Sequence, residues 1–447
     1  MIQPTRREFL EAAGATAAAA GWPLAAGVRG QSTAAGAGKA RPKVAVIATA
    51  YHYLSHAYHI VGRFLDGFEM HDGTGLHRPD FEVASLFIEQ TPANDLGRDK
   101  ARRHDVRLAA TVADALMLGT GRVAVDGVLL IAEHGEYPFN EKLQKLYPRA
   151  KLFREVLEVL KTFDRPVPIF IDKHLSYDAA EARRMSDAAR AAKVPLMAGS
   201  SLPITWRLPE VEVPLGLAWE EALVASRGEI EIFGFHALES LQCMAERRDR
   251  KGRPQGIAAV TCLEGDAVWE ASRKGLWSAG LLKAALGRSH TLNPGDVRQN
   301  TRDFVPPPNR PSFLAAPIAF LVEYADGFKG TALILNGHVD DTTFAARIAR
   351  ADDPIASTLF YLPAPPGANF FNPLVLRIED FLRTGRPPYP VERTLLTGGA
   401  LDALLESRLR RGRRVETPDL AAVDYEPPAD SGFIRTPIAG GPGRAPG

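Results

Sequence analysis

The sequence has 447 residues, of which 45% are hydrophobic and 24% charged, and its formal net charge is +1. This composition is typical of a globular protein of two or three domains. A near-neutral charge excludes binding to nucleic acid through a global basic field. The two cysteines, Cys243 and Cys262, are too few for a disulfide-rich scaffold or a multi-cysteine metal module.

The first 40 residues have the pattern of a targeting segment. Residues 5–10 (TRREFL) carry a twin-arginine motif, and the alanine-rich stretch 12–26 that follows is too short and too weakly apolar for a good membrane span. We therefore expect a Tat signal peptide and linker over residues 1–40. The Tat translocon would then be a partner, and the protein would be exported to the periplasm or cell envelope.

From residue 43 onward, short apolar runs alternate with helical patterns. Strands are expected at 43–50, 81–88, 125–131, 167–171 and 194–198, and helices at 53–68, 112–118, 151–163 and 178–192. This alternation predicts an α/β fold with a Rossmann-like, doubly wound parallel sheet over residues 41–200. In such a sheet a ligand binds at the carboxyl ends of the strands.

After about residue 206 the alternation loosens. Residues 256–263, 320–324 and 330–335 favour strands of a second, mostly antiparallel open sheet in an α/β domain over 201–380. Residues 374–382 and 395–409 have helical patterns, so we expect C-terminal helices (381–425) that pack back on the core. The proline- and glycine-rich tail, 426–447, is expected to be disordered.

Three segments in this order resemble the Gfo/Idh/MocA family. They are residues 166–199, which place Asp172-Lys173-His174 between a strand and an alanine-rich helix, residues 228–239 (GEIEIFGFHALE), and residues 381–414. The resemblance spans most of residues 43–415. It implies a Rossmann domain followed by an open-sheet domain, and NAD(P)-linked oxidation or reduction of a sugar or polyol hydroxyl. The family often pairs through the open sheet, which implies a homo-oligomer.

The resemblance also assigns roles to single residues. Lys173 would contact nicotinamide and the substrate hydroxyl, and His236 would be the partner acid/base. The cofactor NAD or NADP would contact the turn Ala48, Thr49 and Ala50, together with Asp172. Glu89 follows the second expected strand, where a Rossmann fold places the ribose-binding acid.

The sequence departs from the family pattern at the turn that would bind the cofactor and at the position of the family's aspartate. The turn that follows the first strand, 48–53 (ATAYHY), contains no glycine, although glycines let backbone N–H groups approach a pyrophosphate. The family's aspartate, four residues before His236, falls on Ile232, with Glu231 beside it.

A second interpretation comes from the histidines. His52, His56 and His59 have the spacing of one helix face, and Glu133 and His134 follow the third strand. Imidazoles and carboxylates bind divalent metals. These side chains, together with the polar-cleft residues His174 and Glu239, could form the site of a protein that binds no dinucleotide. Such a protein would be a metal-dependent hydrolase, lyase or epimerase, or would only bind a ligand.

Overall fold

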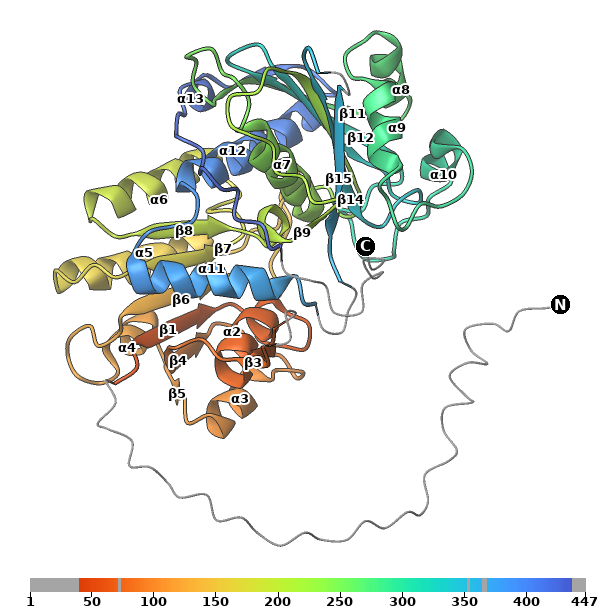
Figure 1. Cartoon of the computed structure of the whole chain (residues 1–447). Helices are drawn as coiled ribbons and strands as arrows, with labels where there is room; N and C mark the ends of the chain where they lie inside the picture. Colours follow the sequence, from red (N-terminus) through yellow and green to blue (C-terminus); the bar gives the residue numbers. More distant parts are fainter. Residues whose placement is uncertain (1–39, 71–73, 352–353, 364–367, 436–447) are drawn as a thin grey trace, which may run out of the picture. The chain divides into compact units, whose positions relative to one another are not determined.

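The computed structural model describes residues 40–70, 74–351, 354–363 and 368–435. Nearly all of the expected signal peptide and linker lies outside these residues. The described part of the chain from Arg41 onward forms one compact unit, which contains two large sheets and a two-stranded hairpin (Figure 1).

The first sheet has six parallel strands in the order β5-β4-β1-β6-β7-β8. The strands are β1 (Lys43–Ala48), β4 (Glu82–Ile88), β5 (Arg107–Leu108), β6 (Gly127–Ile131), β7 (Ile169–Asp172) and β8 (Leu196–Gly199). The connecting helices are α2 (His56–Asp66), α3 (Gly97–Arg103), α4 (Val112–Met117), α5 (Arg149–Thr162) and α6 (Ala179–Ala191). A small hairpin, β2 (Phe68–Glu69) and β3 (Leu76–His77), follows α2.

Both faces of this sheet are buried, which explains its continuous apolar runs. In β1, Val44 and Val46 pack in one core with α2, whereas Ala45 and Ile47 pack in another with α4, α5 and α6. The alternation follows from the two-residue period of a strand. The predicted parallel, doubly wound sheet is confirmed.

The second sheet has eight strands in the order β16-β11-β12-β13-β10-β14-β15-β9, and all neighbours are antiparallel except β10 and β13. The strands are β9 (Trp206–Leu208), β10 (Trp219–Ser226), β11 (Ile257–Glu264), β12 (Ile318–Tyr324), β13 (Lys329–Ile334), β14 (Thr342–Ile348), β15 (Ile355–Tyr361) and β16 (Val415–Glu416). A 3-10 turn (Leu202–Ile204) connects the two sheets. The predicted second, mostly antiparallel sheet is confirmed.

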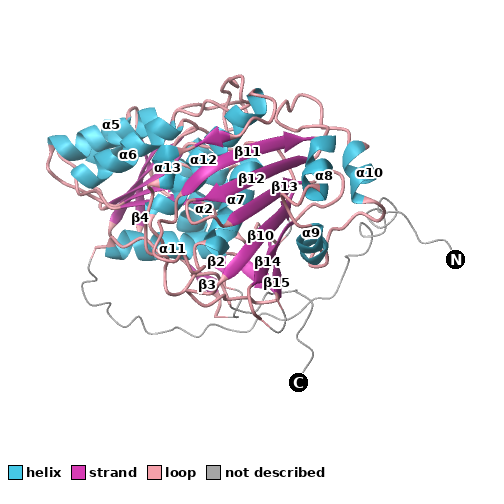
Figure 2. Ribbon diagram, turned by 90° about the horizontal axis from the view of Figure 1, so that it is seen from above, coloured by secondary structure: helices cyan, strands magenta, loops and turns pink. Residues whose placement is uncertain are grey.

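Helices cover both faces of this second sheet (Figure 2). One face packs against α7 (Ile232–Ala245) and α12 (Val391–Leu409), and the other against α8 (Asp266–Arg273) and α9 (Ala279–Leu286). The short α10 (Val297–Arg302) follows α9. Trp269 and Trp277 anchor the second layer. The face expected to be open for pairing is thus partly covered by the chain's own helices, and pairing through it stays a prediction.

The C-terminal helices pack on elements of both large sheets' layers. Helix α11 (Phe371–Thr384) packs on α2, and α12 packs on α6 and α7. After α13 (Pro418–Ala421), the prediction of a disordered tail from residue 426 is wrong for residues 426–435. Phe433 is buried there between the guanidinium groups of Arg207 and Arg435, which hold it by cation–π contacts. Residues 436–447 lie outside the described part.

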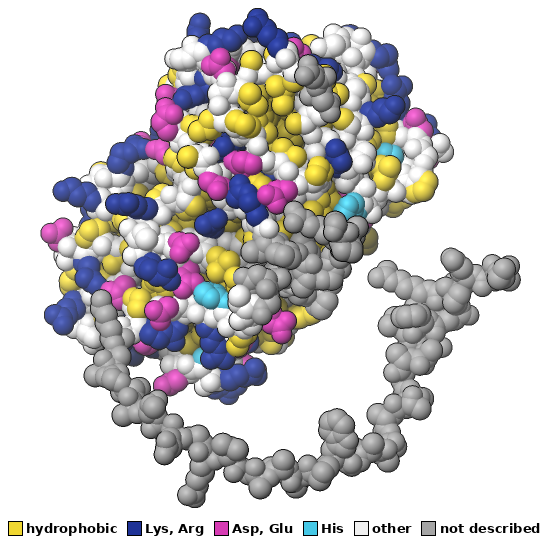
Figure 3. Space-filling model, in the orientation of Figure 1, with side chains coloured by type: hydrophobic (Ala, Val, Ile, Leu, Met, Phe, Trp, Pro, Cys, Tyr) yellow, Lys and Arg dark blue, Asp and Glu magenta, His cyan; other side chains and the backbone are white. Residues whose placement is uncertain are grey.

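The helices and the charged side chains agree with the composition of the sequence. Among the described residues, no helix combines the length and apolar character that a membrane crossing requires. Figure 3 shows basic and acidic side chains interspersed over the visible face, in keeping with the near-neutral net charge.

Candidate functional site

Buried charges meet at the carboxyl ends of β6 and β7. Lys173 Nζ donates a hydrogen bond to Glu133 Oε1 at 2.8 Å, and Arg149, the first residue of α5, donates to the other carboxylate oxygen. All three side chains are at most 3% exposed. Burial alone would raise the pKa of Glu133, but the positive charges of Lys173 and Arg149 hold that pKa well below its usual value.

A second pair links α2 to the same edge. His56 is the first residue of α2, and its Nδ1 lies 2.6 Å from Asp172 Oδ2 at the end of β7. The rings of His52 and His56 both contact that of His134, with centroids 5.1 and 5.4 Å apart. Asp172 Oδ1 and His134 Nε2 are buried and have no hydrogen-bond partner among the described residues. Such atoms mark a place where a polar ligand or water can bind.

His174 lies between a cation and an anion. Its Nε2 is 3.4 Å from Arg149 and 3.4 Å from Glu231 Oε1. Burial lowers the pKa of His174, and the charge of Arg149 acts in the same direction. Glu231, which the sequence places beside the position of the family's aspartate, therefore contacts His174.

His236 has a different carboxylate partner. Its Nδ1 is 3.0 Å from Ser200 Oγ, and that hydroxyl also donates to Glu239 one turn further along α7. Burial lowers the pKa of His236, while the nearby carboxylate of Glu239 opposes the shift. Lys173 is close enough for its charge to lower this pKa as well. The predicted catalytic residues Lys173 and His236 thus lie in one polar cluster.

The turn after β1 does not form the usual phosphate cradle. Ser55 precedes α2, and its hydroxyl accepts hydrogen bonds from the backbone N–H groups of Tyr58 and His52. The N–H group of Tyr58, in the first turn of α2, would otherwise be free to bind an anion at the helix N-terminus. The turn is also free of glycine, and the side chain of Tyr51 is fully buried in it.

A segment from the neighbouring strand crosses this turn. We call residues 134–137 the crossing segment. Gln90, after β4, exchanges two hydrogen bonds with the backbone of Glu136, and Tyr137 donates to Glu89 Oε2 at 2.5 Å. Because β1 lies between β4 and β6, the crossing segment passes over the end of β1. A dinucleotide held in the usual way, with its pyrophosphate on this turn, does not fit the residues present here.

The cofactor residues predicted from the sequence have other partners. Thr49 Oγ1 bonds the backbone oxygens of Glu133 and His134, and Ala48 and Ala50 are fully buried. Glu89 lies after β4, as expected, but Tyr137 and Lys151 bind its two carboxylate oxygens.

The structure does not assemble the alternative metal site. Helix α2 begins at His56, so His52 precedes the helix and does not share its face with the other two. His59 is on the core side, where its ring stacks on Phe371 with centroids 4.8 Å apart. Within the residues that the structure describes, no group of three or more His, Cys, Asp or Glu side chains could hold a metal ion.

Sequence reasoning missed two members of the cluster. Arg149 stands in an ordinary helix start, and no local pattern distinguishes it from a surface arginine. Ser200 lies in a Gly-Ser-Ser stretch that lacks the spacing of a nucleophile elbow. Only the order of β6, β7 and β8 in the sheet brings these side chains to Glu133 and His236.

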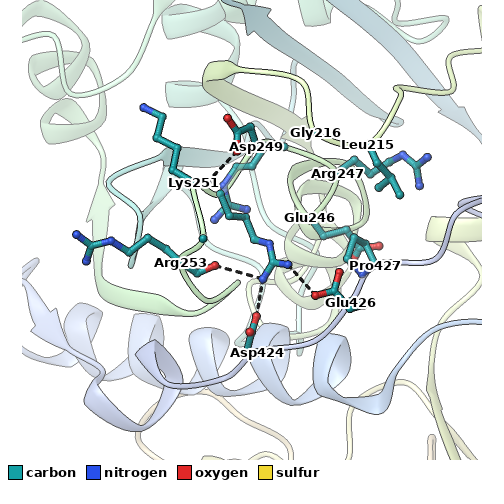
Figure 4. A pocket seen from close by; sticks show the side chains of 13 residues that line it. Leu215, Gly216, Glu246, Arg247, Asp249, Lys251, Arg253, Asp424, Glu426 and Pro427 are labelled. Atoms are coloured by element: carbon teal, nitrogen blue, oxygen red, sulfur yellow. Dashed lines mark hydrogen bonds and ion pairs between the residues drawn. The ribbon is translucent and has the colours of Figure 1, made fainter.

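A hollow of about 390 Å³ lies at the opposite end of α7 (Figure 4). Within this hollow, Arg250 binds Asp424 and Glu426. This hollow contains none of the predicted site residues.

No protein-family model matches the sequence, and no curated protein matches it. Among solved structures, the chain is similar to GenD2 from gentamicin A biosynthesis in complex with NAD. The two have 16% identity and a TM-score of 0.51, over 84% of this chain and 96% of that one. An oxidoreductase from Agrobacterium radiobacter (12%, TM-score 0.49, covering 84% and 98%) and a Gfo/Idh/MocA family oxidoreductase from Vibrio cholerae (14%, 0.47, covering 83% and 99%) also match. The likeness to GenD2 shows the fold of this chain, and its parallel and mostly antiparallel sheets match the two sheets that the resemblance to the Gfo/Idh/MocA family predicted.

Proposed function

We propose that the protein is an enzyme that moves a proton at a hydroxyl-bearing carbon of a sugar or polyol, with Lys173 and His236 as its central residues. The observation that carries this proposal is the buried cluster at the strand ends, which combines an ammonium group, a neutral imidazole and ionised carboxylates. Pairs of titratable groups with perturbed pKa values are typical of acid–base catalysis.

The chemistry of the cluster suits a hydroxyl group. Lys173 uses one N–H to bind Glu133, which leaves two donors for a substrate oxygen. His236 is kept neutral by burial and can accept a proton. Asp172 Oδ1 and His134 Nε2 offer further partners for the hydroxyl groups of a polyol.

The first candidate reaction is NAD(P)-linked oxidation or reduction of the hydroxyl. Its support is the fold shared with GenD2 and the position of Lys173 at the end of β7. Nicotinamide would supply the hydride chemistry. Because the turn after β1 lacks the usual phosphate cradle, this candidate requires a different mode of holding the nucleotide.

The second candidate is a redox-neutral reaction, an epimerisation or elimination, in which a carbon-bound proton is lost and no dinucleotide takes part. The crossing segment and the glycine-free turn favour it. In this reaction His236 would take the proton from a carbon next to a carbonyl group of the sugar, and Lys173 would stabilise the negative charge that moves onto the carbonyl oxygen. In an epimerisation the proton returns to the other face of that carbon, and in an elimination the hydroxyl group on the next carbon leaves as water.

One experiment separates the two. The purified chain is titrated with NAD and NADP up to millimolar concentration by calorimetry, and then incubated with a panel of sugars and polyols in D₂O. Nucleotide binding together with substrate-dependent formation of reduced nicotinamide supports the first candidate. Deuterium on a substrate carbon without added nucleotide supports the second. If no compound of the panel gives reduced nicotinamide or deuterium on carbon, or if Lys173→Ala forms either product as fast as the wild type, the proposed function is wrong.

We further propose that the protein is exported by the Tat pathway. The support is the twin-arginine motif at residues 6 and 7 and the alanine-rich stretch after it. Cell fractionation should find the wild type in the periplasm or envelope, and the Arg6→Lys, Arg7→Lys variant in the cytoplasm. Equal export of both chains would contradict this.

A further inference from the structure

The hydroxyl group of Ser200 lies between His236 and Glu239. Ser200 Oγ is 3.0 Å from His236 Nδ1 and donates to Glu239 Oε2, and the backbone N–H of Ser200 donates to Glu239 Oε1 at 3.1 Å. Ser200 follows β8, whereas the other two residues are one turn apart on α7. Both Ser200 and Glu239 are almost completely buried.

Counting protons fixes the direction of each hydrogen bond. A hydroxyl group has one proton, and a carboxylate only accepts. Because the proton of Ser200 points to Glu239, the Ser200 oxygen must accept from His236, so Nδ1 of His236 carries the proton. The backbone N–H of Leu202, 3.4 Å away, is a second donor to the same oxygen. The lone pair of the neutral imidazole is therefore on Nε2.

We propose that Ser200 is a positioning residue that, together with Glu239, holds His236 in the tautomer protonated at Nδ1, so that Nε2 is the general base of the site. The proposal rests on the proposed function. When Nε2 takes a proton from substrate, the imidazole becomes a cation. The carboxylate of Glu239, 3.6 Å from Nδ1, then stabilises the new charge.

The pairing of Ser200 with Glu239 provides a carboxylate near His236 although position 232 is an isoleucine. The resemblance places an aspartate there, four residues before His236, and this chain has none. Glu231, the neighbouring carboxylate, contacts His174 instead. Glu239, three residues after His236 in α7, supplies a carboxylate instead, and the hydroxyl group of Ser200 is hydrogen-bonded to both side chains. A nucleophilic role for Ser200 would require His236 to accept the hydroxyl proton, which here points to Glu239.

The tautomer can be measured without a substrate. The full chain is labelled with ¹⁵N-histidine, and long-range ¹H–¹⁵N spectra show which ring nitrogen carries the proton; His236→Asn assigns the signal. We expect the Nδ1–H form in the wild type and in Ser200→Thr, which keeps the hydroxyl. In Ser200→Ala we expect a shift to the Nε2–H form. Ser201→Ala is the matched control and should not change the signal.

The Nε2–H form in the wild type, or the same tautomer in Ser200→Ala, would overturn the proposal. If Ser200→Ala does not fold, Ser200→Cys tests the same point, because a thiol is a weak acceptor. A protein with no measurable turnover but the expected tautomers would contradict the proposed function and leave the positioning role intact. Once a substrate is found, Ser200→Ala should lower kcat about tenfold or more, with KM changed less than about twofold.

Discussion

Lys173 Nζ lies 2.8 Å from Glu133 Oε1, and both side chains are buried at the ends of adjacent parallel strands. Arg149 binds the other oxygen of the same carboxylate. One buried anion is thus shared by two buried cations. Removal of that anion leaves both cations without compensation, so Glu133 couples the stability of the fold to the chemistry of the site.

Glu133→Gln should destabilise the protein by about 3–5 kcal/mol, the usual cost of breaking a buried ion pair from one side. Urea denaturation followed by circular dichroism measures this free energy. The control is Glu136→Gln, an exposed carboxylate in the same loop, which should change stability by less than about 0.5 kcal/mol. Equal stability of the two variants would mean that solvent compensates Lys173 and Arg149.

The stability should also fall in mild acid because of His59. Burial, aided by the charge of Arg63, lowers the pKa of His59 from 6.5 to about 4. Between these values the unfolded chain binds a proton that the folded chain does not, so stability decreases as pH falls from 6.5 to 4. A shift of this size corresponds to up to about 3 kcal/mol.

His59→Leu should flatten that slope, because no group titrates at this position. The measurement is the free energy of unfolding at several pH values between 4 and 8. A matched control is His104→Leu, a histidine near the surface that pairs with Asp66. If His59→Leu keeps the full slope of the wild type, the buried ring is not the cause.

Much of the fold could be predicted because its strands are strongly patterned. KVAVIA, GVLLI and IFID are buried on both faces, and each was expected within two residues of its observed bounds. Strands β10, β14 and β15 and helices α8 and α9 were missed. The helices belong to the layer that covers the second sheet, where tertiary packing around Trp269 and Trp277 fixes short helices with weak patterns of their own.

The site could be predicted only where one strand end carries it. Lys173 and His174 follow β7 directly, and Glu133 follows β6, so their convergence was foreseeable. Arg149 and Ser200 reach the cluster through the sheet order and the long β6–α5 connection. The expected histidine face failed because Ser55 caps α2 and starts the helix at His56, which separates His52 from the helical period.

The crossing segment should control access to the turn after β1. Tyr137→Phe combined with Gln90→Ala removes three hydrogen bonds that hold it. At about 0.5–1.5 kcal/mol each, their loss should make opening easier and lower the Kd for NAD at least about tenfold. Calorimetric titration measures this. Lys151→Met, which alters Glu89 without touching the crossing segment, should leave the Kd unchanged. An unchanged Kd in the double variant would show that the segment does not gate nucleotide binding.

Gly199 should be essential for the geometry around Glu239. Its φ is +139°, and a Cβ at this position would collide with the hydroxyl of Tyr389 and lie 3.1 Å from Glu239 Oε1. Gly275 has φ +73° with open space around it, so it shows the cost of an alanine in the left-handed region without any side-chain collision. We expect Gly275→Ala to cost about 1 kcal/mol of stability and Gly199→Ala at least about 2 kcal/mol more, because Tyr389 and Glu239 must move. Thermal and urea unfolding measure both values.

The ¹⁵N signal of His236 should change only in Gly199→Ala, since the displaced Glu239 can no longer accept the proton of Ser200. Equal losses of stability in the two variants would show that the cluster has room to adjust, and that its geometry does not depend on this glycine.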